Sequence, residues 1–253
     1  MISNGRTGAD NQTAGIIAGY VAALQRAAVS LAGVKPNAPI ELRTRFLFNP
    51  ELNSHWFVIP GLAVVIVGIL SILLTALTVA REWENGSMEL LLSTPVRPFE
   101  IIAGKLAPYT ALGLGSIIFV YWAARFVFGV PFRGNHGLFL LSSILFLGTA
   151  LAQGLVISVV TRQQQIAMQM ANMTGMLPSL MLSGFIFPIE SMPVFFQRLT
   201  ALLAPRWFMT ANRGLFLKGA GLAELATPLT ALLIINVVLL SLAAKKFKTD
   251  LEP

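Results

Sequence analysis

The chain has 253 residues, of which 55% are hydrophobic and 11% are charged, and its mean hydropathy is +0.74. This balance lies outside the usual range of soluble globular chains, so the lipid bilayer is the expected solvent. The absence of cysteine excludes disulfides, thiolate metal sites and thiol nucleophiles. The formal net charge of +7 comes from Lys and Arg scattered around apolar runs, a distribution that fits lipid headgroups and predicts no nucleic-acid partner.

Residues 1–55 differ in composition from the rest of the chain. An amphipathic helix is predicted over residues 13–31, and the alternation in "IELRTRFLF" predicts a half-buried strand over residues 40–46. So short a segment buries too little apolar surface to form a convincing core alone. We therefore expect residues 1–55 to be the C-terminal part of a larger α+β domain, and the chain to begin inside that domain.

Residues 56–253 predict an α-helical integral membrane domain, because apolar runs of about 20 residues can cross the ~30 Å hydrocarbon core. Five spans are predicted, at about 56–80, 106–128, 138–160, 168–188 and 228–244. The span at 168–188 carries Gln169 and Asn172, which is typical of a helix that faces protein or a water-filled cavity. Residues 189–225 contain Pro193, Pro205, Gly214 and Gly219 among aromatic and basic residues, a pattern that predicts a re-entrant or interfacial region.

The stretch "REWENGSMELLLSTPVRP" (residues 81–98) places a compact block of charge directly after the first apolar run. The helix should end near Gly86, because glycine adopts a positive φ without a steric penalty. A short helix is expected at about 87–94 and should end before Pro95, because the residue before a proline disfavours helical geometry. Pro98 should then open the next helix, with Glu100 in its first turn. The predicted result is a short helix across one face of the membrane.

Three separated regions of the chain, comprising four stretches, carry a resemblance to a known family. "REWENGSMELLLSTPVRPFEIIAGKLAPY" closely resembles the loop between the second and third spans of ABC-2 type permeases. "MLPSLMLSGFIFPIESMP" and "APRWFMTANRGLFLKG" look like the fifth span and the re-entrant extracytoplasmic region of that family, and "IELRTRFLFNPELNSHWFVIPG" is similar to the exit from the large extracytoplasmic domain of its drug-export branch. Relative to the six-span pattern the first span is missing, so we expect an N-terminally truncated permease with five visible spans.

The resemblance implies a permease subunit that moves an amphipathic, drug-like or lipid-like substrate out of the cytoplasm. ATP and Mg would be used by a separate ABC ATP-binding subunit, with no cofactor bound directly by this chain. Further implied partners are a second permease copy (homodimer or paired heterodimer), membrane lipids and a periplasmic adaptor protein. The implied location is the bacterial inner membrane, with residues 1–55 outside the cytoplasm and residues 81–105 and the C-terminus inside it. Charge alone leaves this orientation open.

The resemblance also assigns candidate site residues. The short helix after the second span is the family's coupling helix, which docks in a groove of the ATPase, although a solvated loop is the simpler interpretation of its glutamates. The candidate coupling residues are Glu82, Glu84, Gly86, Met88, Glu89, Leu91, Thr94 and Pro95. The candidate substrate path comprises Asn172, Gln153 and Ser183. Interhelical hydrogen bonding is the simpler interpretation of Gln153, Asn172 and Asn236. The candidate extracytoplasmic gate comprises Pro188, Glu190 and Arg206, and headgroup anchoring is the alternative for Arg206.

The alternative functional classes would show different sequence features. A lipid-linked glycan exporter would normally lack the large extracytoplasmic domain. An ion-coupled secondary transporter would carry carboxylates inside its spans and related halves, whereas no Asp or Glu falls in the middle of a predicted span. An intramembrane enzyme would show facing acid or His pairs. The chain contains no Gly-rich phosphate loop, zinc-binding helix motif or nucleophile elbow, so we expect a transport subunit without ATPase chemistry of its own.

Overall fold

The computed structural model describes residues 19–20, 23–24, 27, 55–88 and 98–249. Contacts divide the chain into two units, Met1–Trp56 and Phe57–Pro253. In the first unit the described residues between 19 and 27 are helical. The strand predicted over 40–46 lies outside the described residues, as does most of the expected α+β domain.

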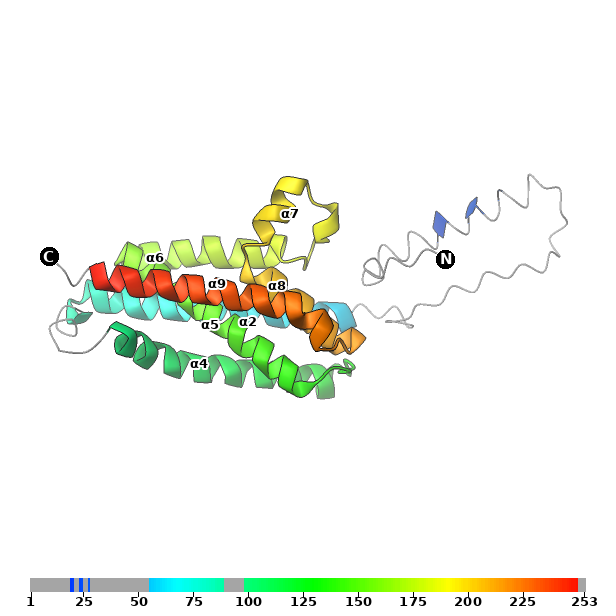
Figure 1. The fold of residues 1–253 in the computed structure, drawn as a ribbon, viewed down its shortest axis with the longest axis horizontal. Coiled ribbons are helices and arrows are strands. Elements are labelled where there is room, and N and C mark those ends of the chain that lie inside the picture. Colours follow the sequence, from blue (N-terminus) through cyan, green and yellow to red (C-terminus); the bar gives the residue numbers. More distant parts are fainter. Residues whose placement is uncertain (1–18, 21–22, 25–26, 28–54, 89–97, 250–253) are drawn as a thin grey trace. The chain divides into compact units, whose positions relative to one another are not determined.

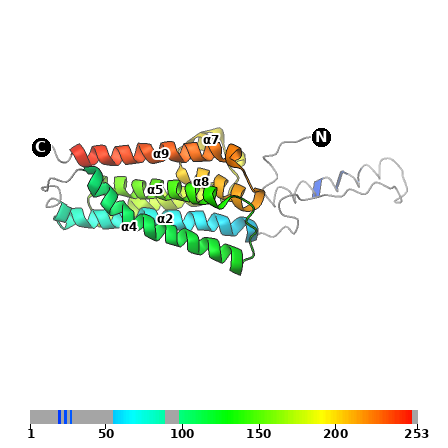
Figure 2. The same cartoon turned by 60° about the horizontal axis from the view of Figure 1, so that its bottom comes forward.

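Four long helices form the bundle of the second unit and lie side by side in both views (Figures 1 and 2). They are α2 (His55–Glu84), α4 (Pro98–Trp122), α5 (His136–Thr161) and α9 (Leu222–Thr249). The π-helical segment η1 (Ala123–Val127) prolongs α4. Each of the four contains a segment long and apolar enough to cross a membrane. Four of the five predicted spans therefore correspond to such helices, with ends shifted by a few residues.

The predicted span at 168–188 has a different structure. Its helical run consists of α6 (Gln164–Ala171) and two π-helical segments, η2 (Asn172–Met176) and η3 (Pro178–Leu182). Pro178 has no N–H to donate, and a wider π-turn is one way for a helix to accommodate such an interruption. The helix ends at Leu182, earlier than predicted, and Gly184 follows with a φ of +84°. This run is not among the helices that are apolar enough to count as candidate spans, because Gln and Asn interrupt it.

Helix α5 lies at the centre of the bundle, where it packs against α4, α6, α8 and α9. Its buried face includes Phe146, Leu147, Leu151 and Leu155. At Gly154 the α5 backbone lies so close to α2 that an added Cβ would be 2.5 Å from the Ile72 carbonyl oxygen. Helix α4, by contrast, is largely exposed.

Residues 189–218 form short helices. Some of their ends fall at the prolines and glycines that predict an interrupted region. These are η4 (Ile189–Ser191), α7 (Val194–Thr200), α8 (Ala204–Arg213) and the π-helical η5 (Gly214–Lys218). Helix α7 begins after Pro193, and Gly219 ends η5 with a φ of +67°. The four prolines and glycines of this region predict interruptions, but Gly214 does not interrupt the helix, because it keeps right-handed helical geometry between α8 and η5.

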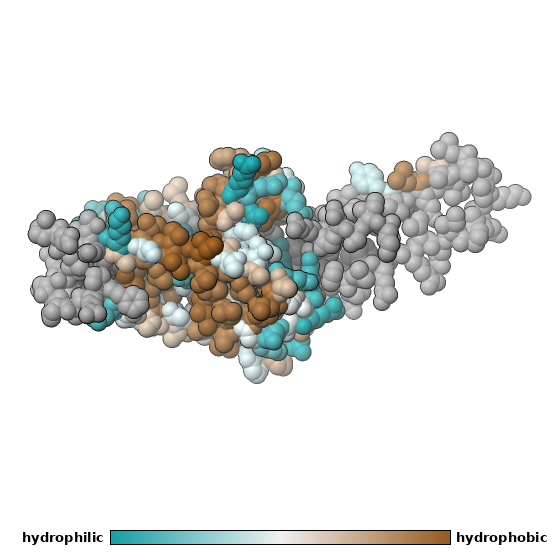
Figure 3. All heavy atoms as spheres, viewed as in Figure 1, coloured by the Kyte–Doolittle hydropathy of each residue, from teal (hydrophilic) through white to brown (hydrophobic). Residues whose placement is uncertain are grey.

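Hydrophobic side chains cover much of the visible bundle face, and hydrophilic ones gather toward its ends and on the region of α7 (Figure 3). Helix α8 buries the side chains of Phe208 and Met209, which pack with Val64 of α2 and Phe146 of α5. Exposed Val194 and Phe195 lie on α7. This arrangement fits the predicted re-entrant or interfacial region, which stays a prediction.

Candidate functional site: the charged turn after α2

The turn after α2 begins where the sequence predicts. Helix α2 ends at Glu84, and Gly86 has a φ of +71°. The amide of Gly86 donates to the Trp83 carbonyl oxygen at 3.1 Å, which closes the turn. Helix α4 begins at Pro98 with Glu100 in its first turn, as predicted. The candidate coupling residues beyond Met88, namely Glu89, Leu91, Thr94 and Pro95, lie outside the described residues.

Glu82 is joined to α4 by an ion pair with Lys105. The Lys105 side chain is only 14% exposed and that of Glu82 is 34% exposed. The two residues belong to consecutive helices and lie at the same end of the bundle. The pair therefore ties the end of α2 to the first turns of α4.

Trp83 and Glu84 tie the same helix end to the connection between α5 and α6. The Glu84 carboxylate accepts a hydrogen bond from the Gln164 backbone amide, 3.3 Å away. Gln164 is the first residue of α6, where a negative charge interacts favourably with the helix dipole. The Arg162 guanidinium lies 4.7 Å from the centre of the Trp83 ring, in cation–π geometry. Arg162 ends α5 in the left-handed conformation, with a φ of +52°.

Met88 anchors the start of the segment that follows the turn. The residue is helical and fully buried, at 0% exposure. Its buried neighbours come from α2, α4, α5 and α9 and are Val79, Ile102, Leu155, Val159 and Ala243. The Ser87 hydroxyl donates to the Glu82 carbonyl oxygen at 3.1 Å, which satisfies an acceptor at the end of α2. The Met88 side chain thus faces the bundle core.

Among the polar residues within the predicted spans, Gln153 and Asn236 connect helices. The Gln153 amide of α5 donates to the Thr174 carbonyl oxygen of η2 at 3.2 Å, and the Asn236 amide of α9 donates to the Leu145 carbonyl oxygen at 3.2 Å. These bonds match the simpler interpretation. Asn172 is half-buried in η2, and buried Ser183 donates to the Ser179 carbonyl oxygen.

The candidate gate residues lie on both sides of α7: Pro188 and Glu190 precede it, and Arg206 lies in α8. One Arg206 nitrogen donates to the Gln197 carbonyl oxygen and to the Thr200 hydroxyl, both at 2.6 Å. Partial burial lowers the pKa of the Arg206 guanidinium, because desolvation disfavours the charged form. Pro188 accepts a hydrogen bond from the Ser191 amide, while Glu190 is exposed. Arg206 thus holds α7 against α8, a role that sequence reasoning did not assign.

Four residues with structural roles are absent from the predicted sites: Lys105, Arg162, Gln164 and Asn212. The Asn212 amide donates to the Pro60 carbonyl oxygen at 2.8 Å. Lys105 had a usable signal, since it is a basic residue seven positions after Pro98, in the helix that follows an acidic turn. Asn212 had one too, because it recurs with Pro205, Phe208 and Met209 at helical spacing on the buried face of α8. Arg162 and Gln164 carry no sequence signal that relates them to Trp83 and Glu84.

Comparison with known proteins gives the family. The profile described as "ABC-2 family transporter protein" matches residues 7–245. The chain is 38% identical over 246 residues to "Probable multidrug ABC transporter permease YbhS" of Escherichia coli strain K12, covering 95% of this chain and 63% of YbhS. It is 33% identical over 214 residues to "Probable multidrug ABC transporter permease YbhR" of the same strain, covering 85% of this chain and 58% of YbhR.

A eukaryotic relative also matches. "ABC transporter G family member 20" of Dictyostelium discoideum is 30% identical over 185 residues, which are 73% of this chain and 25% of that protein. The chain thus spans about three fifths of the length of the two bacterial relatives. The resemblance found in the three sequence regions is confirmed, and the chain belongs to the ABC-2 family of transporter permeases.

Proposed function

We propose that the chain is the membrane-embedded part of an exporter permease that moves amphipathic, drug-like or lipid-like molecules out of the cytoplasm. The energy would come from ATP, hydrolysed with Mg by a partner ATP-binding subunit. The family to which the chain belongs consists of membrane transport subunits that are not themselves the ATPase. Two relatives are named multidrug permeases, and that name motivates the proposed substrate class.

The observation that carries the proposal is the bracing of the charged turn. Glu82 is paired with Lys105, Glu84 accepts from the amide of Gln164, and Met88 is buried in the core. A helix at 87–94 would therefore stand on a base fixed to α2, α4 and the α5–α6 connection. Motion imposed on that helix by a partner would reach several membrane helices at once, which is what coupling to an ATPase requires.

The assignments within the proposed docking segment follow from this base. Glu89, Leu91, Thr94 and Pro95 would contact the ATP-binding subunit, because they follow the buried anchor at Met88. Glu82, Glu84, Gly86 and Met88 would position the segment from inside the permease. This division separates contact residues from positioning residues, and mutagenesis can test it.

The proposed membrane topology rests on the family resemblance and on the fold. The helical run of α6, η2 and η3 would be the fifth crossing, since it lies alongside the bundle (Figure 1). Residues 81–105 and the C-terminus would lie in the cytoplasm of a bacterial cell, and residues 1–55 outside it. A second permease copy would complete the transporter, and a periplasmic adaptor would be a further partner.

Charge reversal at Glu89 tests the proposed function. Glu89→Lys should leave membrane insertion nearly intact and weaken the complex, since reversing a charge at a desolvated contact costs a few kcal/mol. At about 1.4 kcal/mol per tenfold change in affinity, most of the complex would be lost. The matched control is Glu224→Lys, which reverses an exposed charge in the first turn of α9.

The measurements are co-purification of the ATP-binding subunit with the permease and substrate-stimulated ATP hydrolysis in proteoliposomes. Loss with Glu89→Lys and retention with Glu224→Lys support the proposal. Wild-type binding and stimulation by Glu89→Lys would make the docking role untenable.

A further inference from the structure

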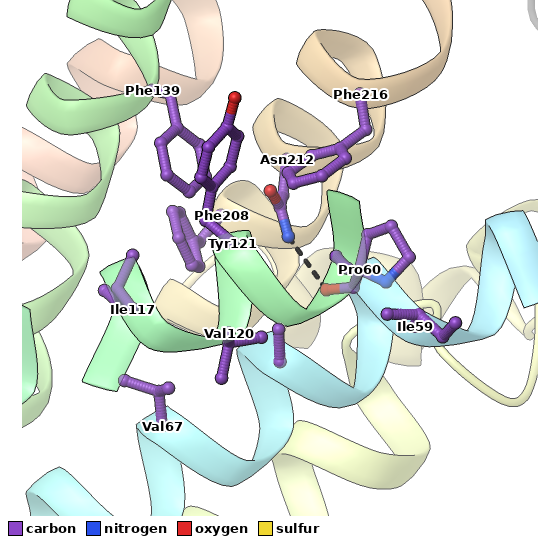
Figure 4. Close-up of a pocket in the computed structure, with 12 residues that line it drawn as sticks. Ile59, Pro60, Val67, Ile117, Val120, Tyr121, Phe139, Phe208, Asn212 and Phe216 are labelled. Atoms are coloured by element: carbon purple, nitrogen blue, oxygen red, sulfur yellow. Dashed lines mark hydrogen bonds between the residues drawn. The ribbon is translucent and has the colours of Figure 1, made fainter. Parts of the chain in front are cut away.

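An apolar cavity lies between the start of α2, the end of α4, the start of α5 and the α8–η5 helix (Figure 4). The space between these elements is about 330 Å³ when open solvent is counted, and its enclosed part is much smaller, with room for a small head group only. Four aromatic rings line it, those of Tyr121, Phe139, Phe208 and Phe216. The cavity is at the end of the bundle opposite the charged turn, because α2 begins and α4 ends there.

Asn212 is the polar side chain that distinguishes this cavity. The residue is only 2% exposed, and its amide nitrogen donates to the Pro60 carbonyl oxygen at 2.8 Å. Exchanging the amide oxygen and nitrogen would bring two acceptor oxygens together, so this bond fixes the orientation of the group. The Asn212 amide oxygen, which Figure 4 shows turned away from Pro60, has no hydrogen-bond partner among the described residues. A buried acceptor without a donor is unfavourable, so an occupant that donates to it would be favoured.

The chemistry of the lining limits which kinds of molecule the cavity can bind. The Tyr121 hydroxyl is already engaged with the His136 Nε2 atom, 2.9 Å away. A water molecule needs two to four polar partners to be well held, and the unpaired oxygen of Asn212 offers one. Among the described residues the lining contains no charged side chain, so an ammonium group would have no counter-charge. A carboxylate is unfavourable too, because it would place a second acceptor oxygen beside the Asn212 oxygen and donate no hydrogen bond to it.

A second hollow is an open groove in which an apolar tail would lie, since Leu70, Leu74 and Leu112 of its lining are 44–61% exposed. It lies along α2 and α4, measures about 340 Å³ including open space, and shares Val67 with the first cavity. Its lining includes Leu74 and Tyr109. Tyr109 and Tyr121 are twelve residues apart on α4, which corresponds to about 18 Å along the helix axis.

We infer that these two cavities form one binding site for a neutral amphiphile whose head donates a hydrogen bond to Asn212. The head would be a hydroxyl or an amide N–H, and the apolar tail would lie between α2 and α4. This inference goes beyond the proposed transport function, because binding needs neither ATP nor a second subunit.

The test uses the purified chain in lipid nanodiscs, without an ATP-binding subunit. The probe is 1-hexadecanol carrying a photoreactive diazirine, and the comparison compound is its methyl ether, which keeps the tail and loses the donor. Cross-links mapped by mass spectrometry should fall within residues 59–74 and 109–124. Unlabelled 1-hexadecanol should compete about fivefold better than its methyl ether, the value of roughly one neutral hydrogen bond.

Two variants test whether the preference for the alcohol over the ether depends on the Asn212 amide oxygen. Asn212→Leu should bring the alcohol-to-ether ratio to about one, whereas Asn236→Leu, which removes an interhelical asparagine elsewhere, should leave the ratio unchanged. Lipid extraction distinguishes two sources of the ligand: a resident membrane lipid with a hydroxyl head would be recovered with the chain, and a transient cargo would not. Equal competition by alcohol and ether in the wild-type chain, or cross-links outside the two cavities, would overturn the inference whatever the variants do. Because no ATP-binding subunit takes part, failure here is distinguishable from failure of the proposed transport function.

Discussion

Substitution of Gly154 tests the close packing of α5 against α2. In Gly154→Ala the new Cβ would lie 2.5 Å from the Ile72 carbonyl oxygen and 3.0 Å from the Thr75 Cβ. An ordinary carbon–oxygen contact is about 3.3 Å, so the helices would have to separate by about 0.8 Å. Overpacking of this kind typically costs 1–3 kcal/mol, about 2 kcal/mol at the centre of the range.

Gly115 provides the matched control. It is exposed on α4, and an added Cβ would meet no atom within 4 Å. Gly115→Ala should therefore stabilise the protein by about 0.5–1 kcal/mol through helix propensity alone. Since both variants gain the same propensity term, the difference between them isolates the packing cost, which we expect to be about 1–3 kcal/mol.

The assay is reversible unfolding of the purified protein in mixed micelles with increasing SDS, followed by tryptophan fluorescence. Gly154→Ala should unfold at a lower SDS fraction than both the wild type and Gly115→Ala. If Gly154→Ala is as stable as Gly115→Ala, the two helices do not approach each other as described, and the reasoning about α5 as the central helix fails.

Three further predictions concern the charged turn. Glu84→Ala should speed amide hydrogen exchange over residues 164–167 about two- to fivefold, since a charge at a helix N-terminus contributes 0.3–1 kcal/mol; unchanged exchange would mean that the contact with α6 is not made. Met88→Ala should destabilise the protein by about 2–5 kcal/mol in the SDS assay and Met88→Leu by less than about 1.5 kcal/mol, whereas equal stability of the two would place Met88 outside the core. A cysteine at Asn85 should resist an impermeant thiol reagent in intact cells while one at Asn11 reacts, and the opposite result would reverse the proposed orientation.

Local chemistry made much of the fold predictable. Gly86 ends α2 and Pro98 opens α4 because backbone freedom and a fixed φ act within a few residues. The four apolar helices follow from hydropathy and length. The same local rules failed at Gly214, since a glycine permits a helix break and does not force one.

The contacts that hold the candidate site could not be predicted in the same way. Glu84 and Gln164 are 80 positions apart in sequence, and only the packing of α5 against α2 brings them together. Asn212 was predictable as a buried residue from its spacing, but not as a donor to Pro60. Met88 was assigned to the coupling residues through the family resemblance, and its burial, which depends on contacts with α5 and α9, could not be read from the sequence.

The central claim is that the segment after the charged turn docks on an ATP-binding subunit. Because the chain has no native cysteine, a single cysteine at Leu91 can carry a benzophenone maleimide in membranes that contain both subunits. The control is a cysteine at Leu222, which is 63% exposed at the start of α9. The account predicts cross-links to the ATP-binding subunit from position 91 and none from position 222. Cross-links from position 222 alone, or from neither position while the two subunits co-purify, would contradict it.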